Sequence, residues 1–132
     1  MIGIVVVTHG SLANELVNAT RQIVGEIPAI RAVSIGWADD VGVAREAIER
    51  ALQEVGGSEA LVLTDMFGGT PTNLSLPFLS ERVEIVTGVS LPMLIKATSL
   101  REGDLRELAR LIRDQGRGAI CVASEVLETG KA

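Results

Sequence analysis

Two kinds of segment alternate along this chain, and their alternation constrains the fold more than any other feature. Five short apolar runs rich in β-branched residues are separated by stretches in which apolar residues recur every three or four positions. The runs are Ile2 to Thr8, Ala32 to Trp37, Ala60 to Thr64, Val83 to Thr87 and Ala119 to Ala123. Short, continuously apolar runs are typical of strands covered on both faces, as in a parallel sheet.

The intervening stretches have the pattern of amphipathic helices. From Val41 to Val55 the apolar side chains share one face, and Gly56 is a natural stop. The same pattern recurs before Gly25 and before Gly116. Residues suited to N-capping precede the predicted helices, and they are Ser11, Asp39 or Asp40, Thr70 with Pro71 after it, and Ser90. We therefore predict an α/β, doubly wound domain with a mostly parallel sheet, strand order beginning 2-1-3-4, and a last strand of undetermined direction.

Size and composition exclude several classes of protein. The 132 residues suffice for one domain, and no linker or low-complexity tract divides residues 1–132. No apolar run approaches the ~20 residues that a membrane span needs, and no basic residue precedes the first run, as a secretion signal would require. One cysteine, Cys121, suits a reducing compartment. We expect a cytoplasmic protein without direct membrane insertion.

The placement of the basic residues, the few aromatic residues and the lack of a phosphate-binding motif argue against nucleic acid as a partner and against a self-contained nucleotide kinase. The net charge is −5, the basic residues are scattered, and two Phe, one Trp and no Tyr offer no stacking platform. The lysines are Lys96 and Lys131, and no glycine-rich loop ends in Lys-Ser or Lys-Thr.

Residues with chemical potential lie at two strand ends. The first run ends in Thr8-His9-Gly10, which contains the only histidine, and the third leads into "TDMFGGTPTN" from Thr64 to Asn73. Ligands of open α/β sheets bind outside the carboxyl ends of the strands, where the winding direction reverses. If strands one and three are neighbours about 4.8 Å apart, His9 and Asp65 face each other there.

This pair predicts a nucleophilic imidazole. A carboxylate that accepts a hydrogen bond from one ring nitrogen fixes the tautomer and makes the other nitrogen, Nε2, more basic. Gly68 and Gly69 allow close backbone approach, and Thr70 opens a helix whose free N–H groups favour an anion. We predict His9 and Asp65 as catalytic residues, phosphate binding at Gly68, Gly69 and Thr70, and neither a metal nor a cofactor.

Structural roles compete with each of these assignments. A lone histidine after a strand more often closes a turn, and Asp65 alone could cap one; only the two together favour a site. Trp37 either lines the crevice or, somewhat more commonly for such a residue, covers the core. Met66 and Phe67 are either core or a docking rim. The other candidates for the crevice or a docking surface are Gly10, Pro71, Asn73 and Ser90.

At these motifs the chain resembles the enzyme IIA domain of the mannose family of the bacterial phosphoenolpyruvate-dependent sugar phosphotransferase system. The resemblance rests on "THG", "DMFGGTPTN" and "VTGVSLPML" at Val86 to Leu94, in this order. It implies a phosphotransferase component in which His9 takes a phosphoryl group from the histidine-containing phosphocarrier protein. The group then passes to a histidine of a IIB protein for sugar uptake of the mannose, fructose or sorbose class. Asp65 would orient the ring.

The resemblance also implies assembly. Its members are dimers that exchange their final strand, here Ala119 to Ala123, which we expect to be antiparallel. Many relatives continue through a linker into a IIB domain, whereas this sequence stops after "EVLETGKA". We therefore expect a IIB partner in trans and recruitment to the inner face of the membrane by transporter subunits.

Two alternatives stay open, and binding of a small ligand without phosphotransfer is a weaker third. The phosphotransfer subunit of phosphoenolpyruvate-dependent dihydroxyacetone kinase resembles this family and also uses a histidine after the first strand, although "GGTP" favours the mannose type. A regulatory module whose phosphorylation changes its binding to another protein would use the same residue. The stretch "SIGWADD" leaves the sugar open.

Overall fold

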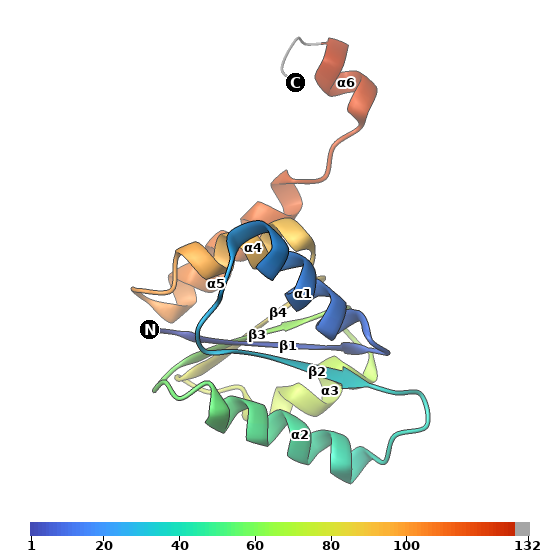
Figure 1. Cartoon of the computed structure of the whole chain (residues 1–132), viewed down its shortest axis with the longest axis vertical. Coiled ribbons are helices and arrows are strands. Elements are labelled where there is room, and N and C mark those ends of the chain that lie inside the picture. Colours follow the sequence, from blue (N-terminus) through green and yellow to red (C-terminus); the bar gives the residue numbers. More distant parts are fainter. Residues whose placement is uncertain (129–132) are drawn as a thin grey trace.

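The computed structural model describes residues 1–128, in which strands and helices alternate (Figure 1). In chain order the elements are β1 (Gly3–His9), α1 (Leu12–Val24), β2 (Ile30–Ile35), α2 (Val41–Glu54), β3 (Ala60–Thr64), α3 (Thr70–Ser75), the 3-10 turn η1 (Leu76–Phe78), β4 (Val83–Thr87), α4 (Leu91–Ser99), α5 (Leu105–Gly118) and α6 (Ala123–Glu128). No helix within this part of the chain is long and apolar enough to cross a bilayer.

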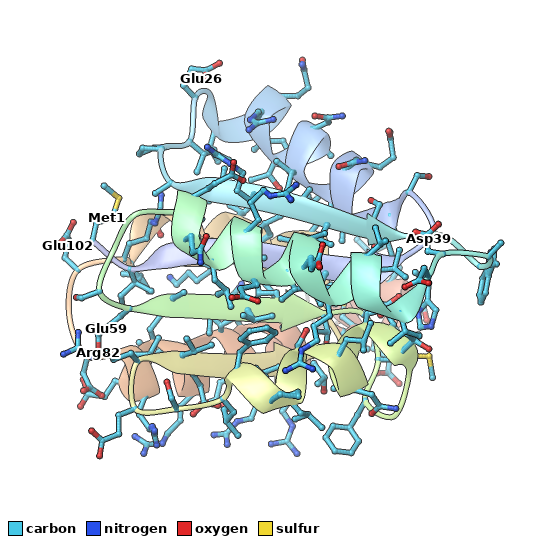
Figure 2. All side chains as sticks on the ribbon, turned by 90° about the horizontal axis from the view of Figure 1, so that it is seen from below. Met1, Glu26, Asp39, Glu59, Arg82 and Glu102 are labelled. Atoms are coloured by element: carbon cyan, nitrogen blue, oxygen red, sulfur yellow. The ribbon has the colours of Figure 1, made fainter. Side chains whose placement is uncertain are left out.

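The sheet has four parallel strands in the order β2-β1-β3-β4, as predicted. Strand β1 lies between β2 and β3, with His9 paired to Ile35 and Val7 paired to Thr64. All four strands therefore end at the same edge of the sheet. Figure 2 shows Asp39, which follows β2, at this edge, whereas Met1 and Glu59, which precede β1 and β3, lie at the opposite edge.

Helices cover both faces of the sheet, with α1, α4 and α5 on one side and α2 and α3 on the other (Figure 1). Alternate residues of β1 point to opposite faces of the sheet and pack against different helices. Ile4 and Val6 pack in the core beneath α1, α4 and α5, while Val5 and Val7 pack in the core against α2. Burial on both faces explains why residues 4–7 of this strand are apolar at every position rather than at every second one.

Two of the predicted helix caps, those at Ser11 and Thr70, are wrong. Asp40 accepts hydrogen bonds from the backbone N–H groups of Gly42 and Val43, as predicted. Ser11, however, makes no side-chain capping bond. The hydroxyl of buried Thr8 replaces it and accepts from the N–H of Ala13 at 2.6 Å.

The start of α3 also differs. Gly69, not Thr70, occupies the N-cap, so Thr70 is the first helical residue and contributes no capping hydroxyl. At α4 the prediction is correct, because Ser90 accepts from the N–H of Met93 at 3.4 Å.

The predicted strand over Ala119 to Ala123 is absent from the described chain. Helix α5 continues through Gly116 to Gly118, residues 119–122 have no regular structure, and α6 follows. The segment leads away from the sheet (Figure 1), which leaves it without a strand of this chain to pair with. Its apolar side chains Ile120 and Val122 are 84% and 58% exposed.

Candidate functional site

His9 and Asp65 meet at the carboxyl edge of the two central strands. His9 is the last residue of β1, and Asp65 follows the last residue of β3. One carboxylate oxygen, Oδ2 of Asp65, accepts from the backbone N–H of His9 at 2.9 Å and lies 2.7 Å from its Nδ1. The predicted pairing is therefore present, and it fixes both the backbone and the ring of the histidine.

The second oxygen of the same carboxylate is also occupied. Oδ1 of Asp65 accepts from the N–H of Met66 at 3.0 Å. Burial by itself would raise the pKa of Asp65, but the backbone hydrogen bond from His9, the bond from its ring and the charge of that ring when protonated outweigh burial. The pKa of Asp65 thus lies below its ordinary value. The group is a carboxylate wherever the imidazole can act as a base.

Two buried threonines hold the loop that carries Asp65. The hydroxyl of Thr72 in α3 hydrogen-bonds to the hydroxyl of Thr64 at 2.8 Å and to the carbonyl oxygen of Met66 at 2.6 Å. Both threonines are fully buried. The loop is thereby tied to the strand that precedes it and to the helix that follows it. Thr72 was not singled out from the sequence, where a threonine in "GGTPTN" has no pattern that marks it.

Gly69 lies against the edge of the imidazole that faces away from Asp65. A Cβ atom built on Gly69 would lie 2.7 Å from Cε1 and 3.2 Å from Nε2 of His9. With φ −88° and ψ 167° its backbone is open to any residue, so glycine is needed here for space. Gly68 differs: its φ is +87°, which favours glycine, and a Cβ atom added there would have no other atom within 4 Å.

The Nε2 side of the ring is the available side. Within residues 1–128, Nε2 of His9 forms no hydrogen bond, and the backbone N–H groups of Gly69 and Thr70 have no acceptor. Nε2 therefore lies beside Gly69, next to a start of α3 that has two unsatisfied backbone donors. This arrangement suits a small anion attached to, or approaching, Nε2.

Three large apolar side chains lie in the connections that follow β2 and β3, and none is core. Trp37 is 87% exposed, so the prediction that it covers the core is wrong. Its ring stacks on His9 with centroids 5.3 Å apart and planes inclined by 30°. Met66 and Phe67 are 56% and 71% exposed, which favours the docking-rim alternative over the core alternative.

The remaining candidates have identifiable structural roles. Gly10 has φ +56° and donates its N–H to the carbonyl of Ile35 at 2.8 Å, so it turns the chain directly after His9. Pro71 is buried in the first turn of α3, and the Asn73 amide donates to the carbonyl of Gly68 at 3.5 Å. Ser90 caps α4 as described above. No group of three or more His, Cys, Asp and Glu residues among residues 1–128 is placed to hold a metal ion.

The contrast between the two glycines predicts a sharp difference between two variants. In Gly69→Ala the new methyl group overlaps the imidazole edge, and displacement of a reacting group by about 1 Å can cost roughly 100-fold in rate. Gly68→Ala meets no atom and carries only backbone strain, which costs about 1 kcal/mol of stability.

The measurement is the rate at which His9 reacts, with thermal unfolding recorded for both variants. We expect a large loss of reactivity with little loss of stability for Gly69→Ala. For Gly68→Ala we expect a loss of stability with little loss of reactivity. Equal reactivity of Gly69→Ala and the wild type would show that the ring is not confined on this side.

Fold and site together define an open α/β domain that presents one imidazole, oriented by a carboxylate, at the point where the strand order reverses. The sequence model of the family described as "PTS system fructose IIA component" (EIIA-man) matches residues 3–112. The chain belongs to this family, the IIA components of phosphotransferase systems of the mannose/fructose/sorbose class. The components of this family are phosphotransferases that work with a phosphocarrier protein and a IIB protein.

Individual relatives agree with this placement. The chain is 32% identical to the PTS system fructose-specific EIIA component of Bacillus subtilis (strain 168), over 99% of this chain and 92% of the relative. It is 30% identical to the PTS system mannose-specific EIIAB component of Escherichia coli (strain K12), over 90% of this chain and 38% of that longer protein. Among solved structures, the mannose/sorbose-specific IIA subunit from Enterococcus faecalis is similar with TM-score 0.85 and 28% identity, covering 92% of this chain and 93% of the subunit.

Proposed function

We propose that this protein is a phosphoryl carrier that accepts a phosphoryl group on Nε2 of His9 and passes it to another protein. The observation that carries the proposal is the 2.7 Å contact between Nδ1 of His9 and Oδ2 of Asp65. A proton held on Nδ1 by this carboxylate leaves the lone pair on Nε2, the nitrogen beside Gly69.

The transfer balances without a further reactant. The Nε2 lone pair attacks phosphorus on the phosphohistidine of the donor, a new N–P bond forms, and the donor N–P bond breaks with its electron pair returning to the donor ring. His9 keeps the Nδ1 proton, so its ring carries a positive charge that the Asp65 carboxylate stabilises. We expect the free N–H groups of Gly69 and Thr70, at the start of α3, to stabilise the phosphoryl oxygens. The onward step reverses these events.

The proposed donor is the histidine-containing phosphocarrier protein, and the proposed acceptor is a histidine of a IIB protein of the mannose, fructose or sorbose class. The family and the relatives named above support both partners. We infer a cytoplasmic location, because this donor is a cytoplasmic protein, with recruitment to the membrane through the transporter subunits.

Radiolabelled phosphoenolpyruvate tests the proposal. Wild-type protein incubated with the two general phosphotransferase proteins is expected to take up a single phosphate that is stable in alkali and labile in acid, as a phosphohistidine is. Omission of the phosphocarrier protein should abolish uptake. Failure of the complete mixture to label the protein would refute the proposal.

The same assay separates the two alternatives. Labelled protein is offered to a IIB protein and, separately, to the dihydroxyacetone kinase subunits. Loss of label only to the kinase would favour that acceptor. Label retained with every acceptor, together with a binding partner that distinguishes the phosphorylated from the unphosphorylated form, would favour the regulatory module.

We also propose a homodimer in which residues 119–123 of one chain pair antiparallel with β4 of the other. Strand β4 forms one edge of the sheet, and a groove beside it is lined by residues of β4 and by three arginines of α5, namely Arg106, Arg110 and Arg113. The exposed side chains of Ile120 and Val122 would find apolar cover from Ile85 and Val86 of β4, which line this groove.

Sedimentation equilibrium tests the dimer. We expect a mass of twice 13.9 kDa for the wild type, and dissociation of the variant in which Ile120→Lys and Val122→Lys are combined, because each ammonium group would be buried beside the arginines of the groove. A wild-type protein that stays monomeric at high micromolar concentration would exclude the exchange.

A further inference from the structure

Trp37 occupies a position that hydrophobic burial does not explain. It lies in the short connection between β2 and α2 and is 87% exposed, although an indole is among the side chains that gain most from burial. The indole ring of Trp37 stacks on the imidazole ring of His9. Trp37 thus contacts the imidazole of His9 and not the core. A role at that imidazole would account for its position.

The connection that carries Trp37 is held in a defined shape. Asp39 accepts from the N–H of Gly36 at 2.6 Å and donates its own N–H to the Gly36 carbonyl at 3.2 Å, which closes a tight turn around Trp37. A Cβ atom on Gly36 would lie 2.9 Å from the Asp39 carboxylate, so glycine allows this closure. Asp40 then caps α2. The indole is therefore presented from a turn that is hydrogen-bonded at both ends.

The other contacts of His9 leave one direction open. Asp65 holds the Nδ1 edge of the ring, and Gly69 lies against the edge formed by Cε1 and Nε2. Both contacts lie at the perimeter of the imidazole, so neither prevents the ring from tilting out of its plane. Trp37 contacts a face. A face contact is the one that fixes the tilt, and with it the direction of the Nε2 lone pair.

We propose that Trp37 is a positioning residue for the phosphoryl-carrying imidazole, a role that rests on the proposed function. By covering one face of His9, the indole fixes the plane of the ring and stabilises the positive charge that the ring carries while phosphorus is bound to Nε2. Aromatic faces attract cations by about 0.5–1 kcal/mol at exposed sites and more where water is excluded. The contact thus strengthens as the phosphorylated state forms.

A docking role for Trp37 makes a different kinetic prediction. A side chain that only contacts the partner protein changes the concentration of phosphocarrier needed for half-maximal rate, whereas a positioning residue changes the maximal rate. The two roles are therefore separated by measuring kcat and KM with the phosphorylated phosphocarrier as substrate.

Three variants form the experiment. Trp37→Leu keeps apolar bulk but removes the aromatic face, Trp37→Phe keeps a smaller face, and Val43→Ala removes an exposed apolar side chain from the first turn of the adjoining helix α2. We expect kcat to fall roughly two- to fivefold in Trp37→Leu with KM unchanged, the size of one cation–aromatic contact at an exposed site. Trp37→Phe should restore most of kcat, and Val43→Ala should match the wild type. A rise in KM alone, or unchanged kinetics in Trp37→Leu, overturns the proposal.

A second readout needs no phosphotransfer. Since His9 is the only histidine in the sequence, its Cε1 proton gives one NMR signal, and the ring current of the indole displaces that signal. We expect the displacement to disappear in Trp37→Leu and to persist in Val43→Ala; an unmoved signal in Trp37→Leu overturns the contact. If the wild type shows the displacement but takes no label, the proposed function fails, and the positioning role falls with it, while the ring contact stands.

Discussion

Replacing His9 with alanine is expected to reduce phosphate incorporation from phosphoenolpyruvate to background. The sequence contains no other histidine, so no second imidazole can accept the group. Alanine keeps the backbone N–H that donates to Asp65, so the hydrogen bond between the end of β1 and the loop after β3 is retained. The variant should therefore lose labelling without losing its fold. Labelling is measured on the isolated protein with the two general phosphotransferase proteins present.

The control for this variant is its unfolding transition, which should stay close to that of the wild type. Label that persists in His9→Ala would identify a different acceptor, and its chemistry would tell which one. A phosphate on the Asp65 carboxylate is an acyl phosphate and is released by hydroxylamine, whereas one on the exposed thiol of Cys121 is not an acyl group and would not behave in this way. Either result would remove His9 from the centre of the mechanism.

The arrangement of His9 and Asp65 could be predicted because it depends on topology alone. The apolar runs predicted the strands, and in a sheet that begins 2-1-3 the ends of the first and third strands are neighbours. Residues that directly follow those ends are then brought together whatever the details of the loops. For this reason the contact between His9 and Asp65 and the strand order both agree with the sequence-based expectation.

Contacts that depend on loop conformation could not be predicted. Thr72 reaches Thr64 and Met66 only because of the path of the loop between β3 and α3, and Trp37 covers His9 only because of the turn after Gly36. Neither contact has a periodic signal in the sequence.

Arg101 is the clearest such case. This buried guanidinium donates to the carbonyl oxygens of Ile2, Pro28 and Ala29, residues about 70 to 100 positions away in the chain. The predicted fifth strand is absent because the chain after α5 leads away from the sheet, so residues 119–123 do not pair with the free edge of β4.

Substituting Asp65 with asparagine is expected to slow phosphorylation by up to about 10⁴-fold, the loss caused by the same replacement in the histidine–aspartate pair of a serine protease. Oδ2 of Asp65 accepts two N–H groups from His9, and Oδ1 accepts the N–H of Met66. An asparagine has one oxygen and one NH2 group. If its oxygen faces His9, the NH2 group meets the N–H of Met66; if it is turned round, the NH2 group meets the His9 donors.

In the turned orientation the amide donates to Nδ1, which moves the ring proton to Nε2 and removes the lone pair that attacks phosphorus. In both orientations the negative charge that stabilises the phosphorylated ring is lost. Asp40→Asn is the matched control, because it removes the same charge while asparagine remains a good N-cap for α2. Its labelling rate should equal that of the wild type. A wild-type rate in Asp65→Asn would eliminate the carboxylate from the mechanism.

The dependence of stability on pH provides an independent measurement. Because the pKa of Asp65 is lowered in the folded protein, this carboxylate stabilises the fold fully at pH above its unfolded pKa. That contribution is lost as the pH falls through the lower folded pKa. Asparagine does not titrate, so the free energy of unfolding of Asp65→Asn should decrease less steeply on acidification than that of the wild type. Urea unfolding across the acidic range measures this difference, and parallel curves for the two proteins would show that the folded carboxylate gains nothing from His9.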